Sequence, residues 1–192
     1  MKEFETLTHL IKNRRSIFPN QYTDEKVPDE WIRQILENAN WAPTHKHTEP
    51  WRFHIFTGNS LERLSQYMGA HYKETTEPDK YSERKYQKRK KNPLKSSHVI
   101  AICMQRDSEE RIPEWEEIAA VACAVQNMWL SCTALGLGTY WSTPDAILEA
   151  DDFLGLKEGQ RCLGLFYIGK WDATINIQSM RNPIEEKVVW HE

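Results

Sequence analysis

The stretch Trp41-Ala42-Pro43-Thr44-His45-Lys46-His47-Thr48-Glu49-Pro50-Trp51 joins a helical pattern to a strand pattern. Residues 28–40 before it carry apolar side chains at helical spacing, and residues 51–56 alternate in the manner of a strand. Two prolines stiffen the loop between them, and residues 44–48 supply polar groups at close spacing. Rigid loops of this kind hold planar cofactors with polar edges, but an ordinary helix-to-strand connection has the same composition. The stretch alone leaves both interpretations open.

A pair of arginines follows the first helical pattern of the chain. Residues 6–15 carry their apolar side chains on one face, which predicts a short helix ending at Arg14-Arg15-Ser16. The planar, permanently charged guanidinium is suited to bidentate phosphate binding. Cations at the end of a helix are also favoured by its macrodipole, by roughly 0.3–1 kcal/mol each. The pair therefore indicates either a phosphate site or simple stabilisation of the helix end.

The rest of the chain alternates between helices and strands in one domain without repeats or linkers. Helices are predicted over residues 28–40, after a cap at Ser60, and over residues 114–135. Strands are predicted over residues 51–56, 98–104, 139–141 and 163–168, the last ending at Gly169.

The helix over residues 114–135 is apolar around more than one face. Such a helix must be buried on several sides, either wholly within one chain or partly against a second subunit. Gly136 fits the left-handed position that ends it, and Ser142 or Thr143 is predicted to cap a following helix with Pro144 in its first turn. A backbone of this kind can run close past a flat ring, although a plain turn has the same pattern.

Three motifs stand in a fixed order: Asn13-Arg14-Arg15-Ser16, then Ala42-Pro43 with Pro50-Trp51, then Gly136-Leu137-Gly138-Thr139-Tyr140-Trp141. Together they resemble the nitroreductase family of flavin mononucleotide (FMN) enzymes, over essentially the whole chain from about residue 4 to residue 189. The His45-Lys46 pair and the short chain resemble the minimal bacterial branch.

The resemblance implies an α+β fold, a three-layer sandwich in which helices flank a mixed, mainly antiparallel central sheet. It also implies a single domain over residues 1–192 and an intertwined homodimer with flavin sites at the subunit interface. The Trp-rich composition, with eight Trp, seven Tyr and six Phe, agrees with flat-ligand pockets and interfaces.

The resemblance also implies roles for particular residues. Arg14 and Ser16 would bind the phosphate and ribityl chain of FMN, with Arg15 close to both the phosphate and the ring edge. Arg181 matches a C-terminal basic residue that reaches the phosphate in many members. The ring would be lined by Tyr140, Trp141 and Ser142 of one subunit and by Trp41, Thr44 and His45 of the other.

Two positions in the loop depart from the family pattern. Glu49 stands where Gln is common, and a carboxylate cannot donate the hydrogen bonds of an amide. His47 stands where larger members often have Asn, and it either donates to a flavin or substrate oxygen or points to solvent. With these two changes, the loop does not indicate which substrate the protein binds.

A strongly basic segment, Lys80 to Lys95, interrupts a chain whose net charge is −3. It is either a solvated helix with Tyr81 and Tyr86 facing inward, or part of an active-site cover over residues 72–95 whose field attracts NAD(P)H or an acidic substrate. A nucleic-acid surface is disfavoured because the basic pattern is confined to one short segment.

Composition excludes several other classes of protein. No window approaches the roughly 18 apolar residues that span a membrane, and Met-Lys-Glu-Phe-Glu at the start lacks the apolar core of a signal peptide. The four cysteines lie in apolar surroundings without close pairing, which predicts reduced core residues in a cytoplasmic protein. No Ser-His-Asp order, metal-ligand cluster or phosphate-binding P-loop is present, so no residue is predicted to be catalytic.

The resemblance therefore implies an FMN enzyme that takes hydride from NADH or NADPH and passes it to nitroaromatics, quinones or similar acceptors in a ping-pong cycle. One alternative is an enzyme of the same fold with other chemistry, such as dehalogenation or flavin breakdown. The other is a protein that binds flavin without turnover.

Overall fold

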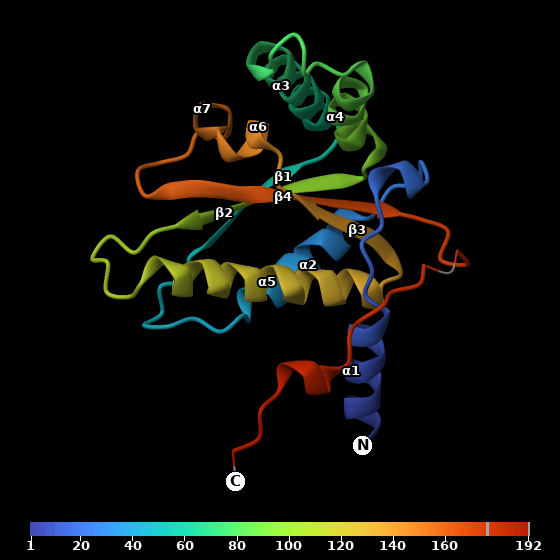
Figure 1. Ribbon diagram of the computed structural model, residues 1–192, viewed down its shortest axis with the longest axis vertical. Helices are drawn as coiled ribbons and strands as arrows, with labels where there is room; N and C mark the ends of the chain where they lie inside the picture. The colour runs from blue at the N-terminus through green and yellow to red at the C-terminus, as the bar shows by residue number, and fades with distance from the viewer. Residues whose placement is uncertain (176, 192) are drawn as a thin grey trace.

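The computed structural model describes residues 1–175 and 177–191. Its centre is one four-stranded sheet built from β1 (Trp51–Phe56), β2 (His98–Gln105), β3 (Leu137–Ser142) and β4 (Gln160–Lys170). The strand order is β1-β2-β4-β3, and every pair within it is antiparallel. Helices cover both faces of the sheet, so the predicted α+β sandwich is confirmed (Figure 1). The sheet was predicted to be mixed, but among the described residues it contains no parallel pair.

The alternation of β2 explains why the sheet needs helices on both faces. Ile100, Ile102 and Met104 belong to the apolar cluster under one face, whereas Val99 and Ala101 belong to the cluster under the other. Side chains of successive strand residues point to opposite faces, so a strand apolar throughout must be covered twice.

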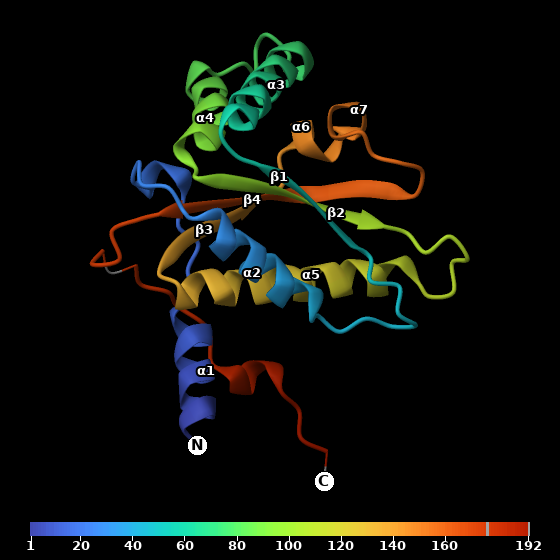
Figure 2. The same cartoon turned by 180° about the vertical axis from the view of Figure 1, so that it is seen from behind.

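Two helices cover one face of the sheet, and four helices cover the other. The first face packs against α2 (Asp29–Asn40) and α5 (Glu114–Ala134) (Figures 1 and 2). The second face carries α3 (Asn59–Thr75), α4 (Glu83–Lys95), α6 (Asp145–Leu148) and α7 (Asp151–Leu154).

The two ends of the chain lie together, away from the sheet. Helix α1 (Lys2–Asn13) buries none of its residues, and it extends beyond α5 beside the C-terminal segment that contains η2 (Ile184–Lys187) (Figures 1 and 2). Phe4 is 72% exposed and Trp190 is 86% exposed. Within the described ranges, no helix is long and apolar enough to cross a membrane.

The first helix spans Lys2–Asn13 and not the predicted residues 6–15. Three other predicted features were wrong for local reasons. Helix α3 begins at Asn59 after Gly58, and the Ser60 hydroxyl instead bonds the backbone of Thr57 within the preceding turn. Neither Ser142 nor Thr143 caps α6, because Ser142 is still paired with Leu165 in the sheet. Strand β4 continues through Gly169 to Lys170, since β3 pairs along its whole length.

Gly136 ends α5 in the left-handed conformation, as predicted, with φ 68°. A Cβ added there would meet no heavy atom within 4 Å, so only the backbone conformation opposes a side chain. We expect Gly136→Ala to lower the free energy of unfolding by about 1 kcal/mol, measured by urea denaturation. Gly136→Asn should cost less, because Asn tolerates this conformation better. Equal losses for Ala and Asn would show that the left-handed backbone is not the cause.

Candidate cofactor site

An unpaired cation lies just beyond the end of α1. The guanidinium carbon of Arg14 lies 4.5 Å from the centre of the Trp129 ring. Its Nη1 atom is buried and has no hydrogen-bond partner among the described residues. Burial, and then the charges of Arg181 and Arg15, lower the pKa of Arg14. A buried donor that is charged and unpaired is unfavourable, and a bound anion would satisfy it.

The two neighbouring arginines are largely occupied by other contacts. Arg15 donates from Nε to the carbonyl of Ile177 at 2.9 Å and from Nη1 to the carbonyls of Lys12 and Arg14. Arg181 donates to the Ser179 hydroxyl and the Met180 carbonyl. The structure thus brings the three predicted arginines close together. Among the described residues, the Nη1 atom of Arg14 remains without a hydrogen-bond partner.

The segment after Arg14 runs beside β3. The backbone N–H of Ile17 donates to the Thr139 carbonyl at 2.8 Å, and the ring of Phe18 lies 4.6 Å from that of Tyr140. A Cβ on Gly138 would come within 2.9 Å of Tyr22 and 3.0 Å of Ile17, so only glycine allows this close approach. The contact brings this segment to the β3 edge of the sheet, where Arg14 packs on Trp129 at the α5 face and the Tyr140 ring belongs to the opposite face.

Residues 140–142 also line a cavity of about 390 Å³. Tyr140 and Tyr167, paired on adjacent strands, stack side by side in one wall at 6.2 Å between ring centres, and the Trp141 indole N–H donates to the Leu163 carbonyl. Burial raises the pKa of Tyr167 well above its usual value, against the effect of the nearby Arg89 charge, so its phenol stays protonated. The remaining wall comes from α4 and from the start of the α6 connection: Lys85, Lys88, Arg89, Asn92, Thr143 and Pro144.

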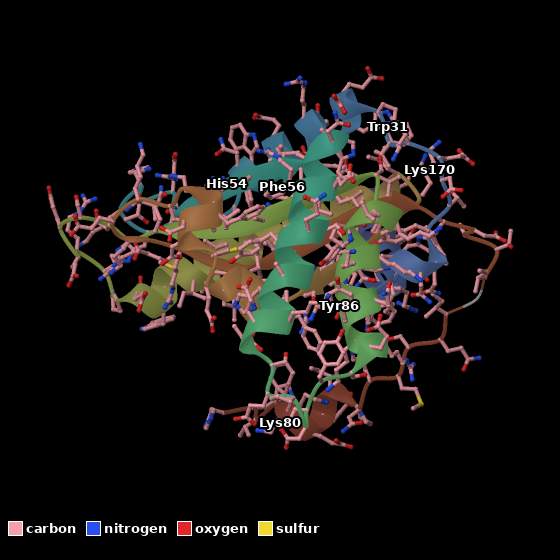
Figure 3. All side chains as sticks on the ribbon, turned by 90° about the horizontal axis from the view of Figure 1, so that it is seen from above. Trp31, His54, Phe56, Lys80, Tyr86 and Lys170 are labelled. Atoms are coloured by element: carbon pink, nitrogen blue, oxygen red, sulfur yellow. The ribbon has the colours of Figure 1, made fainter. Side chains whose placement is uncertain are left out.

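Helix α4 is held over this cavity by its contact with α3. Tyr86 points toward α3 (Figure 3), where a Cβ on Gly69 would lie 3.3 Å from its ring. Tyr81 is 37% exposed, so only Tyr86 faces inward as predicted. Lys85, Lys88 and Arg89 of α4 therefore border a cavity that β3 also lines.

The loop over residues 41–51 lies near the other end of α5. His45 Nδ1 lies 2.7 Å from Glu116 Oε2 in the first turn of α5, whereas Arg14 contacts Trp129. The thirteen-residue separation of these two α5 positions corresponds to roughly 20 Å at 1.5 Å per residue. One chain therefore does not unite Trp41, Thr44 and His45 with the arginine cluster.

The backbone of this loop is strained. Lys46, His47 and Glu49 have φ angles of 51°, 53° and 40°, a region that costs a residue with a side chain roughly 1 kcal/mol or more. The Thr44 hydroxyl accepts the Glu49 N–H at 3.0 Å and holds the turn. Trp41 is 80% exposed, and His47 and Glu49 are exposed too. Strain that is held in place in an exposed loop is typical of a binding site.

Some residues of the site escaped the sequence analysis. Trp129 and Phe18 carry no motif, and their roles arise from long-range packing against Arg14 and Tyr140. The cations that border the cavity could have been found from the sequence, because a shared helix face is indicated by the spacing of Lys85, Lys88, Arg89 and Asn92.

An unexpected Ser-His-Asp contact also appears. Ser97 Oγ lies 3.1 Å from His98 Nδ1, and His98 Nε2 lies 3.0 Å from Asp29 Oδ1. Ser97 is buried and its hydroxyl accepts the Val27 N–H, so this chain anchors the start of α2 and does not present a nucleophile. No group of three metal-ligating side chains occurs in the described part of the chain.

The sequence and the fold both resemble those of known proteins. A model of the nitroreductase family matches residues 11–170. YfhC of Bacillus subtilis (strain 168), named as a candidate NAD(P)H nitroreductase, is 27% identical over 187 residues, which cover 96% of this chain and 94% of that protein.

Two solved structures are similar throughout. A nitroreductase-like family protein from Bacillus cereus has a TM-score of 0.80 and 29% identity, covering 97% of this chain and 96% of that one. A candidate nitroreductase from Desulfovibrio desulfuricans, solved in complex with FMN, has a TM-score of 0.73 and 26% identity with the same coverage.

Proposed function

This chain belongs to the nitroreductase family, and from that premise we propose that it is an FMN-dependent oxidoreductase that uses NADH or NADPH. The observation that carries the proposal is the buried, unpaired Nη1 of Arg14 beside Arg15 and Arg181. A phosphate is the anion that suits a guanidinium fork, and the related protein from Desulfovibrio desulfuricans binds FMN.

The residues that would hold FMN lie in two places along the β3 edge of the sheet. Arg14 would hold the phosphate, with Arg15 and Arg181 adding positive charge nearby. Ser16 would contact the ribityl chain, and Tyr140, Trp141 and Ser142 would line the ring. Gly138 supports this assignment, because it lets residues 14–18 lie close against β3.

The remaining contacts would come from a second copy of the chain. Trp115, Ala119, Ala122 and Cys123 form an exposed stripe on α5, at spacings that place them on one side of the helix. Cys123 therefore is not a core residue of the single chain, unlike the other three cysteines. If two α5 helices pack antiparallel, the Trp41–His45 loop of one subunit meets the arginine end of the other. The predicted homodimer would thus complete the flavin site.

When bound, FMN supplies the two-electron chemistry that no side chain of this site provides. The donor loses a hydride, and a nitro acceptor takes two electrons and two protons, loses water and becomes a nitroso compound. The second proton comes from solvent. Protein groups would bind the donor and the acceptor in turn, in a ping-pong order, and would orient each beside the flavin ring. Nitroaromatics and quinones are the acceptors to assay first.

The test is an absorbance spectrum of the purified protein before and after a donor is added. We expect a yellow protein whose visible flavin bands bleach under anaerobic conditions with NADPH or NADH and return when a nitroaromatic is added. A yellow protein that neither donor bleaches would instead support flavin binding without turnover. Bleaching without reoxidation by nitroaromatics or quinones would support another chemistry on the same fold.

A further inference from the structure

The cationic face of α4 is concentrated on the cavity beside β3. Helix α4 contains seven Lys and Arg side chains among 13 residues and one carboxylate, Glu83. Lys85, Lys88 and Arg89 lie on the cavity side together with Asn92. The lining of this cavity contains no Asp or Glu. Three positive charges therefore face one hollow without a negative charge in its walls.

These three cations are also free of partners elsewhere. Among residues 1–175 and 177–191, none of Lys85, Lys88 and Arg89 forms an ion pair, although Lys80 and Lys95 at the ends of the segment do. Lys85 and Arg89 also border an adjacent hollow that contains Glu77 and Asp145, whereas Lys88 lines only the cavity beside β3. Like charges grouped without counter-ions repel one another, and a bound anion removes that repulsion.

The opposite wall is aromatic and can donate hydrogen bonds. Tyr140 and Tyr167 supply flat apolar surface, and the protonated phenol of Tyr167 can donate to an oxygen atom. The volume of about 390 Å³ is near the small end of the roughly 300–1,000 Å³ found for small-molecule sites. A compact ring with one anionic group matches this combination better than a whole dinucleotide does.

We propose that Lys85, Lys88 and Arg89 form an anion subsite that binds the carboxylate of a small planar acid, whose ring lies against Tyr140 and Tyr167. This rests on the proposed function only in taking the acid to be the electron acceptor. The subsite selects acidic acceptors over neutral ones of the same shape. The donor's phosphates and the FMN phosphate are two other anions that the same charges could hold, and the test separates all three.

The chain offers a matched pair of variants. Lys88→Gln with Arg89→Gln removes one Lys and one Arg from the cavity wall. Arg84→Gln with Lys91→Gln removes the same two charges from exposed positions of the same helix that do not line the cavity. Both variants lower the overall field equally, and surface charges are screened over about 8 Å at 0.15 M salt. A difference between them therefore reports contact with the ligand.

The first measurement needs no turnover. Calorimetric titration of the flavin-loaded protein with benzoate and with benzamide compares two ligands of similar shape, of which only benzoate is charged. We expect tighter binding of benzoate by the unaltered protein, and a loss of about tenfold in the Lys88/Arg89 variant. The Arg84/Lys91 variant should lose less than about twofold, and benzamide should bind all three proteins alike.

The second measurement uses 4-nitrobenzoate and 4-nitrobenzamide as acceptors. The kcat/KM for 4-nitrobenzoate should fall in the Lys88/Arg89 variant, whereas that for 4-nitrobenzamide should not. Equal losses in both variants, or equal losses for both acceptors, would overturn the subsite. If only the rate of reduction by NADPH falls, the charges hold the donor, and if FMN but not riboflavin dissociates, they hold the cofactor. Failure of every protein to reduce either acceptor, with charge-selective benzoate binding intact, would refute the proposed function alone.

Discussion

We expect Ala122→Glu to convert the proposed dimer into a monomer that no longer retains FMN. Ala122 is exposed in the single chain, in the middle of the α5 stripe formed with Trp115, Ala119 and Cys123. In a two-fold contact the new carboxylates of both subunits would be buried close together without partners. Removing such charges from water costs several kcal/mol per ion, which is enough to dissociate a dimer.

Light scattering after gel filtration would measure the mass, and the ratio of flavin to protein absorbance would measure FMN retention. Ala70→Glu is the matched control, because Ala70 is also an exposed alanine of a long helix, α3, on the other face of the sheet. That variant should stay dimeric and yellow. An unaltered protein that is monomeric at micromolar concentration and still binds FMN tightly would contradict a site shared between subunits.

Arg14→Ala is expected to weaken FMN binding by about 1.5–3 kcal/mol, because a charge-assisted bond to the phosphate is lost. The affinity for riboflavin, which lacks the phosphate, should barely change. Titration of the flavin-free protein with each ligand, followed by flavin fluorescence, gives both dissociation constants. The prediction depends on the buried Nη1 that has no partner within the described chain.

The control is Arg63→Ala, which removes an exposed arginine of α3 remote from the arginine cluster. It should leave both affinities unchanged. Arg14 also packs on Trp129, so a fall in the free energy of unfolding alone would not decide its role. Equal weakening of FMN and riboflavin would show that Arg14 supports the fold and does not hold the phosphate.

The elements with strong local periodicity could be predicted from the sequence. The α5 boundaries differ by one residue from the prediction, and β1 was predicted to the residue. Helix caps were predicted poorly, because Ser60 and Ser142 have alternative partners in a turn and in the sheet. A serine that can cap a helix can equally hydrogen-bond nearby backbone, and its local sequence does not decide between them.

The candidate site was predicted unevenly for a similar reason. The arginines and residues 140–142 belong to motifs, so their involvement was visible before any fold was known. Trp129 was not, because its contact with Arg14 joins residues 115 positions apart. A flavin-binding role of the loop over residues 41–49 was implied only by the family resemblance, and its distance from Arg14 in one chain follows only from where each meets α5.

The sequence by itself determined the positions of most helices and strands and the order of the three motifs, whose resemblance to a known family implied the α+β class. These properties depend on side-chain periodicity and spacing along the chain, which are local. Only the tertiary structure decided that Arg14 keeps an unpaired buried nitrogen, and that Lys88 and Arg89 face Tyr140 across a cavity. Those features depend on how α4 packs on α3 and how residues 14–18 meet β3. Such contacts are set by long-range packing, which no local pattern in the chain specifies.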